Sequence, residues 1–589
     1  EKNKRVIHYP VAFVHPIDQS DVSKAIKCGA DNNFPVVAKA GGHSHESYSI
    51  GDKNCALVVD LKNFINVDIN KDSRTVVPYK QIENLGQNPT NKIHNPHNDC
   101  GNIKNNKTYK SDLTNPYCND LISEKNKRVI HYPVAFVHPI NKFDVSKAIK
   151  CGADNNFPVV AKAGGHSFES YSIGDKNCVL VVDLKNFINV DINKDSGTVV
   201  VGPGNRLGKL YWKLNNEDVA FPAGNCPSVG VGVILGGGEG RLTRKFGMSS
   251  DNIEDAQIVL ANGTIVDSVK KHDDLLWALR GAGSAGYGIV TNLTLKIHPI
   301  KNPLSSIKLN YNFTLSATKL LYNTMNQYGY NFDPNLAVDI IHIFSPTEQP
   351  KTLVETLYVG NASELEKCLK EFIKKSNAIG PKNEMGGFNF TEEDWFHAIT
   401  LQNFSNETDL DNFIDKKDKE ERKPVKVKSF YVNTPGLSEK GVKSLFNFMN
   451  KMKDNCSGVI VTTLYGGGNF NNLSRTETAY VHRNFMYDIM IQIELPLRSD
   501  GTYVEDKETR NCLTSLDKFA VKFQKKYTSY ESFQNYIDRS LNDWQCRYYG
   551  ENFKKLVDIK KNYDPSNVFN WKQSIPIGIE GDVIKNFYI

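Results

Sequence analysis

A long internal repeat constrains this 589-residue chain more than any other feature: residues 1–77 return as 124–200, offset by 123 positions. The two copies differ at six positions, which are Asp18/Asn141, Gln19/Lys142, Ser20/Phe143, His45/Phe168, Ala56/Val179 and Arg74/Gly197. Repeats of an old solenoid share a pattern rather than nearly every residue. So slight a divergence indicates a recent duplication or an error of gene assembly.

After residue 77 the two copies part. The first runs into a polar segment rich in Asn and Pro, residues 78–123, which predicts a linker. The second continues into a long sequence of globular type. The first copy holds only half of that layer, so we expect that it cannot close the same core alone. It is expected to be partly ordered, to pair an edge strand with the main domain or another chain, or to be an assembly artefact.

The coarse pattern predicts an α+β fold. Residues 124–303 alternate short strands with helices, and Asn262-Gly263 is typical of a hairpin turn. Residues 304–530 predict a second domain, an antiparallel sheet covered by helices. In its "SELEKCLKEFIKK" helix, Ser363 and Glu366 have the spacing of a capping box.

Composition excludes several classes of protein. No apolar run approaches the roughly 18 residues that a membrane span needs. The net charge is only +6 and Lys alternates with acidic residues, so a nucleic-acid-binding stripe is not predicted. Eleven Cys show no disulfide ladder. The chain starts at Glu1 without Met or a signal peptide, as expected of a processed or truncated product.

Glycosylation sequons favour an extracellular protein, because such sites matter only in a secreted chain. The Asn-X-Ser/Thr sites are Asn106, Asn262, Asn292, Asn312, Asn361, Asn389, Asn403, Asn406, Asn455 and Asn472.

Two glycine-rich loops carry the first chemical signal. "AGGHS" at 163–167 follows a predicted strand, and "GVGVILGGGEG" occupies 230–240. Successive free N–H groups in such loops can hold a phosphate, although either loop can also be a plain turn. Neither opens a βαβ unit as a Rossmann fingerprint does. Between them lies Cys226, and a buried Cys is most often a small hydrophobe.

Six segments in order give a more specific indication. They are "AGGHSFESYS", "GPGNRLG", "CPSVGVG", "GGGEGRLTRKFGMSSDNI", "LRGAGSAGYGIVT" and, at 548–576, "YYGENFKKLVDIKKNYDPSNVFNWKQSIP". Over about residues 124–576 the chain resembles the berberine bridge enzyme-like family of FAD-linked oxidases. The resemblance implies the vanillyl-alcohol oxidase fold: a two-part PCMH-type FAD domain over 124–303, a substrate domain over 304–530, and a C-terminal segment, 531–589, that returns to the FAD domain.

The resemblance also implies how FAD is held. The family's His bonds the flavin 8α methyl group and its Cys bonds ring carbon 6, positions that match His166 and Cys226. Two anchors fix the cofactor and raise its reduction potential. The cofactor-binding residues implied are Gly164, Gly165, His166, Ser167, Cys226, Val229, Gly230, Gly236 and Gly237. Of these, Val229 matches the small residue that leaves room for dioxygen in family oxidases.

We expect His43, in the first copy, to carry no flavin. Bond formation requires the ring to be seated already, and only the second copy continues directly into the remaining pocket segments. The chain departs from the family in reading "GVGV", one residue short and without a His, before the second glycine cluster.

Substrate-side residues are fewer. Tyr536 matches the Tyr that removes a hydroxyl proton in carbohydrate and alcohol oxidases of this type; the alternative is an aromatic packed between domains. A phenol with a pKa near 10 needs a cationic or hydrogen-bonding neighbour, for which Arg483 or nearby Lys residues are candidates. Gln492 resembles a family Gln near the flavin, and Asp538 a turn residue or a partner of Tyr536.

Other polar residues give no assignment. Asn469, Asn471 and Asn472 occupy the stretch where several plant members place a catalytic Glu. His482 is either a ligand-site residue or a structural one. His94, His97 and Cys100 have metal-like spacing, but the set is incomplete and no metal site is predicted.

The sequence therefore predicts an extracellular FAD-dependent oxidase with bicovalently attached flavin. A substrate alcohol or sugar would give its proton to Tyr536 and hydride to flavin N5, and dioxygen would become hydrogen peroxide. The alternatives are an alkaloid or other secondary-metabolite oxidase, and a secreted binding protein that keeps the fold without turnover.

Overall fold

The computed structural model describes residues 124–579 except 130, 132, 134, 178, 302, 377–386, 403, 420–421 and 500. Within the first 123 residues it describes the short segments 12–14, 22–23, 25–27, 30, 36–39, 57–60, 67–70 and 75–78. The predictions for His43, His94, His97 and Cys100 lie outside the described residues.

The two sequence copies join in one six-stranded sheet of order β2-β3-β1-β6-β8-β7. Its strands are β1 (Ala12–Val14), β2 (Val36–Lys39), β3 (Leu57–Asp60), β6 (Ala135–Val137), β7 (Val159–Lys162) and β8 (Leu180–Asp183). Within each copy the three strands are parallel, whereas β1 and β6 pair antiparallel with Phe13 opposite Phe136. One predicted outcome, pairing of an edge strand with the main domain, is thus what the structure shows.

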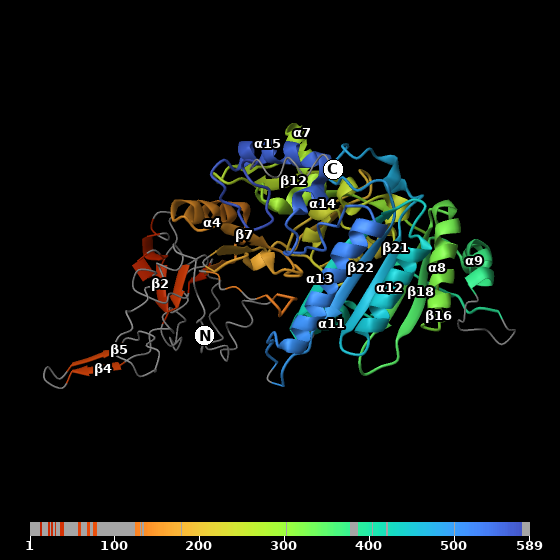
Figure 1. The fold of residues 1–589 in the computed structure, drawn as a ribbon. Helices are drawn as coiled ribbons and strands as arrows, with labels where there is room; N and C mark the ends of the chain where they lie inside the picture. The colour runs from red at the N-terminus through yellow and green to blue at the C-terminus, as the bar shows by residue number, and fades with distance from the viewer. Residues whose placement is uncertain are drawn as a thin grey trace.

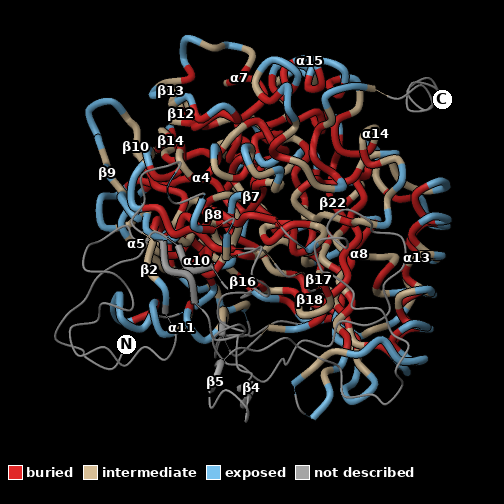
Figure 2. Tube along the Cα trace, turned by 90° about the vertical axis from the view of Figure 1, so that its left-hand side faces the viewer, coloured by how far each residue is buried: buried red, intermediate tan, exposed pale blue. Residues whose placement is uncertain are grey.

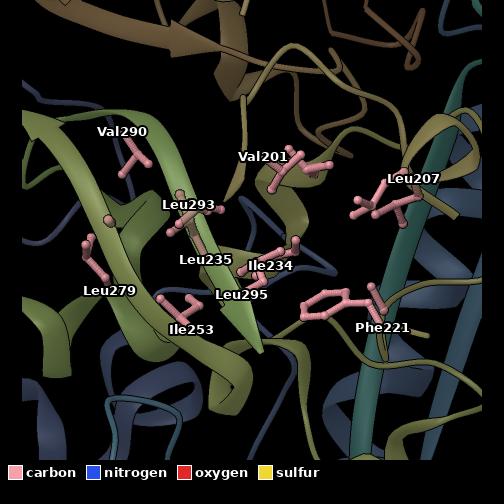
Figure 3. Packing of buried hydrophobic residues seen from close by; sticks show 14 of the residues in the cluster. Val201, Leu207, Phe221, Ile234, Leu235, Ile253, Leu279, Val290, Leu293 and Leu295 are labelled. Carbon is pink, nitrogen blue, oxygen red and sulfur yellow. The ribbon is translucent and has the colours of Figure 1, made fainter. Parts of the chain in front are cut away.

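A five-stranded antiparallel sheet of order β13-β12-β14-β10-β9 completes the layer. Its strands are β9 (Val190–Asn193), β10 (Thr198–Val201), β12 (Ile253–Val259), β13 (Ile265–Val266) and β14 (Ile289–Lys296). The helices of this half are α4 (Lys142–Asp154), α5 (Leu207–Asn215), the short α6 (Thr243–Phe246) and α7 (Asp273–Ala282). Figure 3 shows Val201, Leu207, Leu279 and Leu293 gathering from strands and helices into its buried core.

The second half is a seven-stranded antiparallel sheet of order β19-β16-β18-β17-β21-β22-β20. Its strands are β16 (Leu304–Tyr311), β17 (Leu336–Phe344), β18 (Lys351–Tyr358), β19 (Thr391–Glu393), β20 (Val425–Asn433), β21 (Ser457–Leu464) and β22 (Phe485–Glu494). The helices α8 (Leu315–Tyr328), α9 (Ala362–Ser376), α12 (Glu439–Met452) and α13 (Lys507–Tyr527) cover one face (Figure 1). The predicted α+β class and helix-covered sheet are confirmed.

The capping box predicted for α9 is wrong by two residues. The helix begins at Ala362, so Asn361 and Glu364 form the reciprocal pair. The Glu364 N–H donates to Asn361 Oδ1 at 3.0 Å, and the Asn361 N–H donates to Glu364 Oε2 at 3.1 Å. Asn is as good an N-cap residue as Ser, and Asn361 lies two residues before the predicted Ser363.

The other face of the seven-stranded sheet carries a polar row. Residues directly opposite in neighbouring strands point to the same face. The pairings link Lys308, Glu355, Asp339, Thr463, Asp488 and Tyr431 across six strands. In β22 the alternate residues Tyr487, Ile489, Ile491 and Ile493 pack in the helix-covered core. Strand alternation therefore turns this polar row toward the 124–303 half.

The buried core of the 124–303 half also contains residues from segments much later in the chain. Two helices of the C-terminal segment, α14 (Trp544–Tyr549) and α15 (Phe553–Tyr563), contribute Trp544 and Phe553 to it, and α15 lies beside α7 in Figure 1. α10 (Trp395–Thr400) packs on α5, since the Trp395 and Tyr211 ring centroids lie 5.2 Å apart. Figure 2 shows buried chain in both halves, and one hydrophobic cluster combines Ala337, Leu357 and Trp395 with residues of the 124–303 half, so the two halves share a buried core.

Candidate functional site

The two predicted anchor loops meet backbone to backbone. A Cβ placed on Gly164 would lie 2.6 Å from the Gly230 nitrogen, and one on Gly230 would lie 2.6 Å from the Gly164 nitrogen. Gly165 has φ +66°, a left-handed conformation that favours glycine. The approach requires glycine at both contacts, and it brings the loop of His166 to the loop that follows Cys226.

Arg206 fastens these loops to a third segment. Its guanidinium donates to the carbonyl of Gly164 and, at 2.5 Å, to Asp418 Oδ2. The next residue, Leu207, donates its N–H to the carbonyl of Val229 at 2.8 Å. The start of α5 thus holds both loops.

His166 lies mostly buried in this junction. Its Nε2 is 3.1 Å from Oδ1 of Asp418, which α11 (Glu407–Lys419) supplies from the second half of the chain. Burial lowers the imidazole pKa, an effect that the hydrogen bond with Asp418 opposes. Near neutral pH the ring is therefore neutral, the form with a lone pair available for bonding.

Cys226 presents an exposed thiol that forms no disulfide. Its Sγ lies 3.4 Å from Oγ of Ser228, and its neighbours Pro227 and Ser228 are buried. The reactive atom is thus accessible on a turn whose backbone is fixed. The hydroxyl of Ser167 has a structural task, since it accepts the Tyr171 N–H at 3.0 Å.

The second glycine cluster packs on the C-terminal segment. A Cβ on Gly237, whose φ is +123°, would lie 2.9 Å from Phe533 Cε2 and 2.9 Å from Tyr480 Cε2. A Cβ on Gly236 would overlap Asn535, whose Nδ2 donates to the carbonyl of Val233 at 2.8 Å. Gly236 and Gly237 therefore lie against the Tyr536 segment.

The Tyr536 ring lies between two phenylalanines. Its centroid is 5.8 Å from that of Phe168, two residues after His166, and 5.1 Å from that of Phe533. The structure thus brings Tyr536 beside the His166 loop. Burial raises the phenol pKa well above its usual value, and the carboxyl groups of Glu239 and Asp488 raise it further.

Arg483 does not provide the cation expected beside Tyr536. Its guanidinium donates two hydrogen bonds to Asp251, at 2.7 and 2.6 Å, and a third to Thr478 at 2.8 Å. The charge of Arg483 is therefore paired with Asp251 in a buried bidentate contact and is not directed at Tyr536. The expectation is wrong because nothing in the sequence indicated that Asp251, 232 residues before Arg483, pairs with it.

Aromatic rings surround Tyr536. Tyr431 and Tyr480 share a hydrogen bond between their hydroxyls at 2.8 Å. The buried members of this aromatic cluster are Tyr431, Tyr465, Phe470, Tyr480, Phe485 and Phe533, with Met248. Such walls exclude water, and their hydroxyl groups offer hydrogen bonds to a polar ligand.

Two carboxyl groups that were not predicted enter the same cluster. Glu239 comes from the glycine turn and is 8% exposed; Asp488 comes from β22 and is 3% exposed. Glu239 interacts with Asp488 and with the Tyr431 hydroxyl, while neither of its oxygens nor Oδ1 of Asp488 has good hydrogen-bond geometry with a described residue. Burial raises the pKa of both well above its usual range, and the charge of Asp488 raises that of Glu239 further.

The sequence contains a feature that could have identified both carboxyl groups. Glu239 is the only charged residue in the glycine-rich run 230–240, and Asp488 is the only one in the apolar stretch 485–493. A lone charge in a segment that must be buried is a functional candidate.

A second group of buried charges includes Asp538, two residues after Tyr536. Lys426 Nζ contacts Glu169 at 2.6 Å and also Asp538, while Lys428 Nζ contacts Asp538 at 2.6 Å. Arg128 adds a contact with Glu169 at 2.5 Å. Although burial alone raises it, the two ammonium groups hold the pKa of Asp538 below its usual value. We call these residues the ion network; it joins the His166 loop, β20 and the Tyr536 segment.

Gln492 and His482 were the other predicted residues. Gln492 is on the same sheet face as Asp488, four residues and roughly 13 Å along β22, and its amide donates to Glu494; its place near the flavin stays a prediction. His482 uses both ring nitrogens, with Glu531 at 2.9 Å and Gln534 at 3.1 Å, so it is a structural histidine.

The Asn-rich stretch supports its own turn. Asn471 accepts the Gly467 N–H at 3.0 Å and donates to the carbonyl of Arg483 at 2.6 Å. Among the described residues no cluster of metal-ligating side chains occurs. Likewise, none of the helices in the described part is both long and apolar enough to cross a membrane.

The residues at the loop junction fit a flavin nucleotide. The Gly164–Gly230 contact packs the two glycine loops backbone to backbone and so fixes the position of their main chains, whose amide groups are of the kind that bind a pyrophosphate. A neutral imidazole and an accessible thiol flank this junction, and both are nucleophiles able to bond an electron-poor ring.

Comparison with known proteins agrees with this fit. Residues 133–268 match the family described as FAD binding domain, and 532–576 match the family described as berberine and berberine like. Berberine bridge enzyme-like 19 of Arabidopsis thaliana is 31% identical over 467 residues, which cover 75% of this chain and 79% of that protein.

Solved structures show the same architecture. Physcomitrella patens BBE-like 1 is 32% identical with a TM-score of 0.69, covering 80% of this chain and 96% of that one. A xylooligosaccharide oxidase from Myceliophthora thermophila C1, solved with xylobiose, is 25% identical with a TM-score of 0.69, covering 80% and 97%. This chain therefore belongs to the berberine bridge enzyme-like family and is an FAD-linked oxidoreductase.

Proposed function

We propose that the protein oxidises a hydroxyl-bearing small molecule, an alcohol or a sugar, and passes the electrons to dioxygen. The observation that carries the proposal is the polar row on the inner face of the seven-stranded sheet. It places Asp488 and the Tyr431 hydroxyl in the aromatic cluster beside Tyr536. Tyrosine hydroxyls and carboxyl oxygens suit a ligand with many O–H donors. A relative solved with xylobiose supports the sugar.

We propose that His166 and Cys226 hold FAD covalently, with the Gly164, Gly165 and Gly230 amides on its pyrophosphate. Bound FAD supplies a two-electron acceptor for hydride and a route for those electrons to dioxygen, giving hydrogen peroxide. Val229, half-buried at the loop junction, is proposed to leave the room that dioxygen needs.

Tyr536 is proposed to receive the substrate hydroxyl proton. Phe168 and Phe533 hold its ring edge-on, which fixes where the phenol oxygen can meet a substrate. The buried rings packed against it limit its contact with water, which favours direct proton transfer from a bound substrate.

Peptide mass spectrometry tests the attachment. The FAD-loaded protein should yield flavin on the peptides of His166 and Cys226, and yellow colour should survive acid precipitation. His166→Ala and Cys226→Ala should each leave a single link, whereas Cys368→Ala, a free half-buried cysteine elsewhere, should leave both. Flavin on neither peptide, or on the first copy, contradicts the proposal.

A substrate panel tests the reaction. Peroxide release should accompany oxidation of mono- and oligosaccharides or simple alcohols, and Tyr536→Phe should lower the turnover number about 100-fold or more while the flavin stays bound. Turnover of tertiary amines alone would favour the alkaloid-oxidase alternative. Peroxide release by none of these compounds would contradict oxidase function.

We also propose that the protein is secreted and glycosylated. Of the eight sequon asparagines in the described part of the chain, seven are exposed: Asn262, Asn312, Asn361, Asn389, Asn406, Asn455 and Asn472. The Cys456–Cys512 disulfide suits an oxidising compartment. Treatment of the native protein with an N-glycosidase should lower its apparent mass; no change would contradict glycosylation.

A further inference from the structure

The carboxylate of Asp418 reaches the His166 loop from the second half of the chain. Its Oδ1 lies 3.1 Å from Nε2 of His166, and its Oδ2 accepts a hydrogen bond from the Arg206 guanidinium at 2.5 Å. Only 12% of the His166 side chain and 21% of the Asp418 side chain are exposed, so the contact is largely shielded from water. The FAD anchors proposed above leave this contact without a role.

Helix α11, which carries Asp418, is fixed against α5. Lys209 of α5 contacts Asp411 of α11 at 2.5 Å. Leu410 is fully buried, and a Cβ on Gly208 of α5 would lie 2.9 Å from its Cδ1. The position of Asp418 beside the loop therefore follows from helix packing as well as from its own hydrogen bonds.

The contact decides which ring nitrogen of His166 is available for bonding. An ionised carboxylate can only accept hydrogen bonds, so Nε2 carries the ring hydrogen when it donates to Asp418. In a neutral imidazole the lone pair then lies on Nδ1. Within the described part of the chain, Nδ1 has no hydrogen-bond partner. The nucleophilic nitrogen of His166 is therefore Nδ1.

We propose that Asp418 is a positioning residue for covalent attachment at His166: it holds the tautomer with hydrogen on Nε2 and presents Nδ1 to the 8α carbon of FAD. This inference rests on the proposed attachment. When Nδ1 bonds to that carbon, one C–H bond of the methyl group breaks and its hydrogen leaves as a proton. The two electrons of the broken bond pass through FAD to dioxygen, which takes up this proton and one from solvent and becomes hydrogen peroxide.

Asp418 also compensates the charge that attachment creates. A ring bonded at Nδ1 that keeps its hydrogen on Nε2 is an imidazolium cation. Burial and the charge of Arg206 both lower the imidazole pKa and so disfavour this cation, whereas Asp418 opposes both effects. A carboxylate at hydrogen-bonding distance from a second ring nitrogen fixes tautomer and orientation in the same way at metal sites and in catalytic triads.

The two proposed links differ in their dependence on this carboxylate. His166 meets Asp418, which the second half of the chain supplies, whereas the thiol of Cys226 meets Ser228 of its own loop. Attachment at His166 should therefore require that α11 has packed on α5. Attachment at Cys226 should proceed without Asp418.

The test follows the two links separately in the full-length protein. Protein produced with limiting riboflavin is given FAD in air, and peptide mass spectrometry measures flavin on the His166 and Cys226 peptides over time. Asp418→Ala should slow attachment at His166 about 10–100-fold, while the Cys226 link and the total bound FAD match the wild type. Asp418→Glu, which keeps the charge, should attach faster at His166 than Asp418→Asn, which keeps the shape.

Asp411→Asn is the matched control. Asp411 lies on the same helix but pairs with Lys209, so both links should form at the wild-type rate. An unchanged His166 link in Asp418→Ala overturns the inference, as does faster attachment in Asp418→Asn than in Asp418→Glu. Equal slowing of both links also overturns it, because Asp418 would then only support the fold. A wild type without flavin on His166 overturns the proposed attachment, and this inference with it.

Discussion

Two groups of buried charge differ in how their carboxylates are paired: the ion network around Asp538 and the carboxyl pair of Glu239 and Asp488. In the ion network, Glu169 and Asp538 each meet more than one cation at hydrogen-bonding distance. In the carboxyl pair, Glu239 and Asp488 meet none among the described residues.

The pKa values move in opposite directions as a result. That of Asp538 falls below its usual value, whereas those of Glu239 and Asp488 rise well above it. Burial is common to both groups and raises all three, so the cations make the difference. Compensated charge fixes the site's geometry, and uncompensated charge is left free to change its protonation.

The largest effect is expected from breaking the ion network. Asp538→Asn leaves two buried ammonium groups with one fewer carboxylate, which should lower the free energy of unfolding by about 3 kcal/mol. Urea unfolding followed by intrinsic fluorescence measures it. Glu217→Gln, which removes one partner of the half-exposed pair with Lys194, should lose less than about 1 kcal/mol. Equal losses would show that the network is no stronger than an ordinary pair.

Removing the carboxyl pair should instead raise the free energy of unfolding at alkaline pH. The folded state raises the pKa of Glu239 and Asp488, so it favours their neutral forms; the wild type loses stability as pH rises from their ordinary values near 4 through the folded ones. Glu239→Gln with Asp488→Asn should therefore be more stable than the wild type at alkaline pH, by about 1–2 kcal/mol. Thermal unfolding measured from mildly acidic to alkaline pH checks this, and a less stable double variant contradicts it.

The ion network predicts the opposite pH slope. Because the folded pKa of Asp538 lies below its ordinary 3.8, its stabilisation is fully present above that value. It is lost as pH falls through the folded pKa. In acid unfolding, Asp538→Asn should flatten this slope, whereas the double amide variant of the carboxyl pair should leave it intact.

The smallest effect is expected at the surface. Lys319 pairs with Glu439 at 3.0 Å, and 34% and 66% of these side chains are exposed to solvent. Lys319→Ala should change the free energy of unfolding by less than about 0.5 kcal/mol. A larger loss would mean that burial does not explain the strength of the ion network.

The sequence predicted the parts that follow local rules. Periodicity and turn residues gave the strands, the principal helices and the hairpin at Asn262-Gly263, where Gly263 has φ +78°. Ordered motifs gave His166, Cys226 and the glycine loops, and the structure brings these loops together.

What the sequence did not reveal depends on distant partners. Asp418 reaches His166 from 252 residues away, on a helix whose polar pattern gave no indication of that role. Arg483 was considered for Tyr536 because both lie near the substrate side, yet Asp251 claims it. Glu239 and Asp488 meet only because a glycine turn and a strand centre pack together.

The six-stranded sheet has a consequence that lies outside catalysis. β1 and β6 have the same sequence and pair antiparallel about Phe13 and Phe136, so the contact has the symmetry of a two-fold dimer. Between separate molecules, such self-recognition would depend on protein concentration. Within one polypeptide it depends on the tether, whose length sets an effective local concentration. Duplication has thus placed both partners of a self-complementary strand pair in one polypeptide.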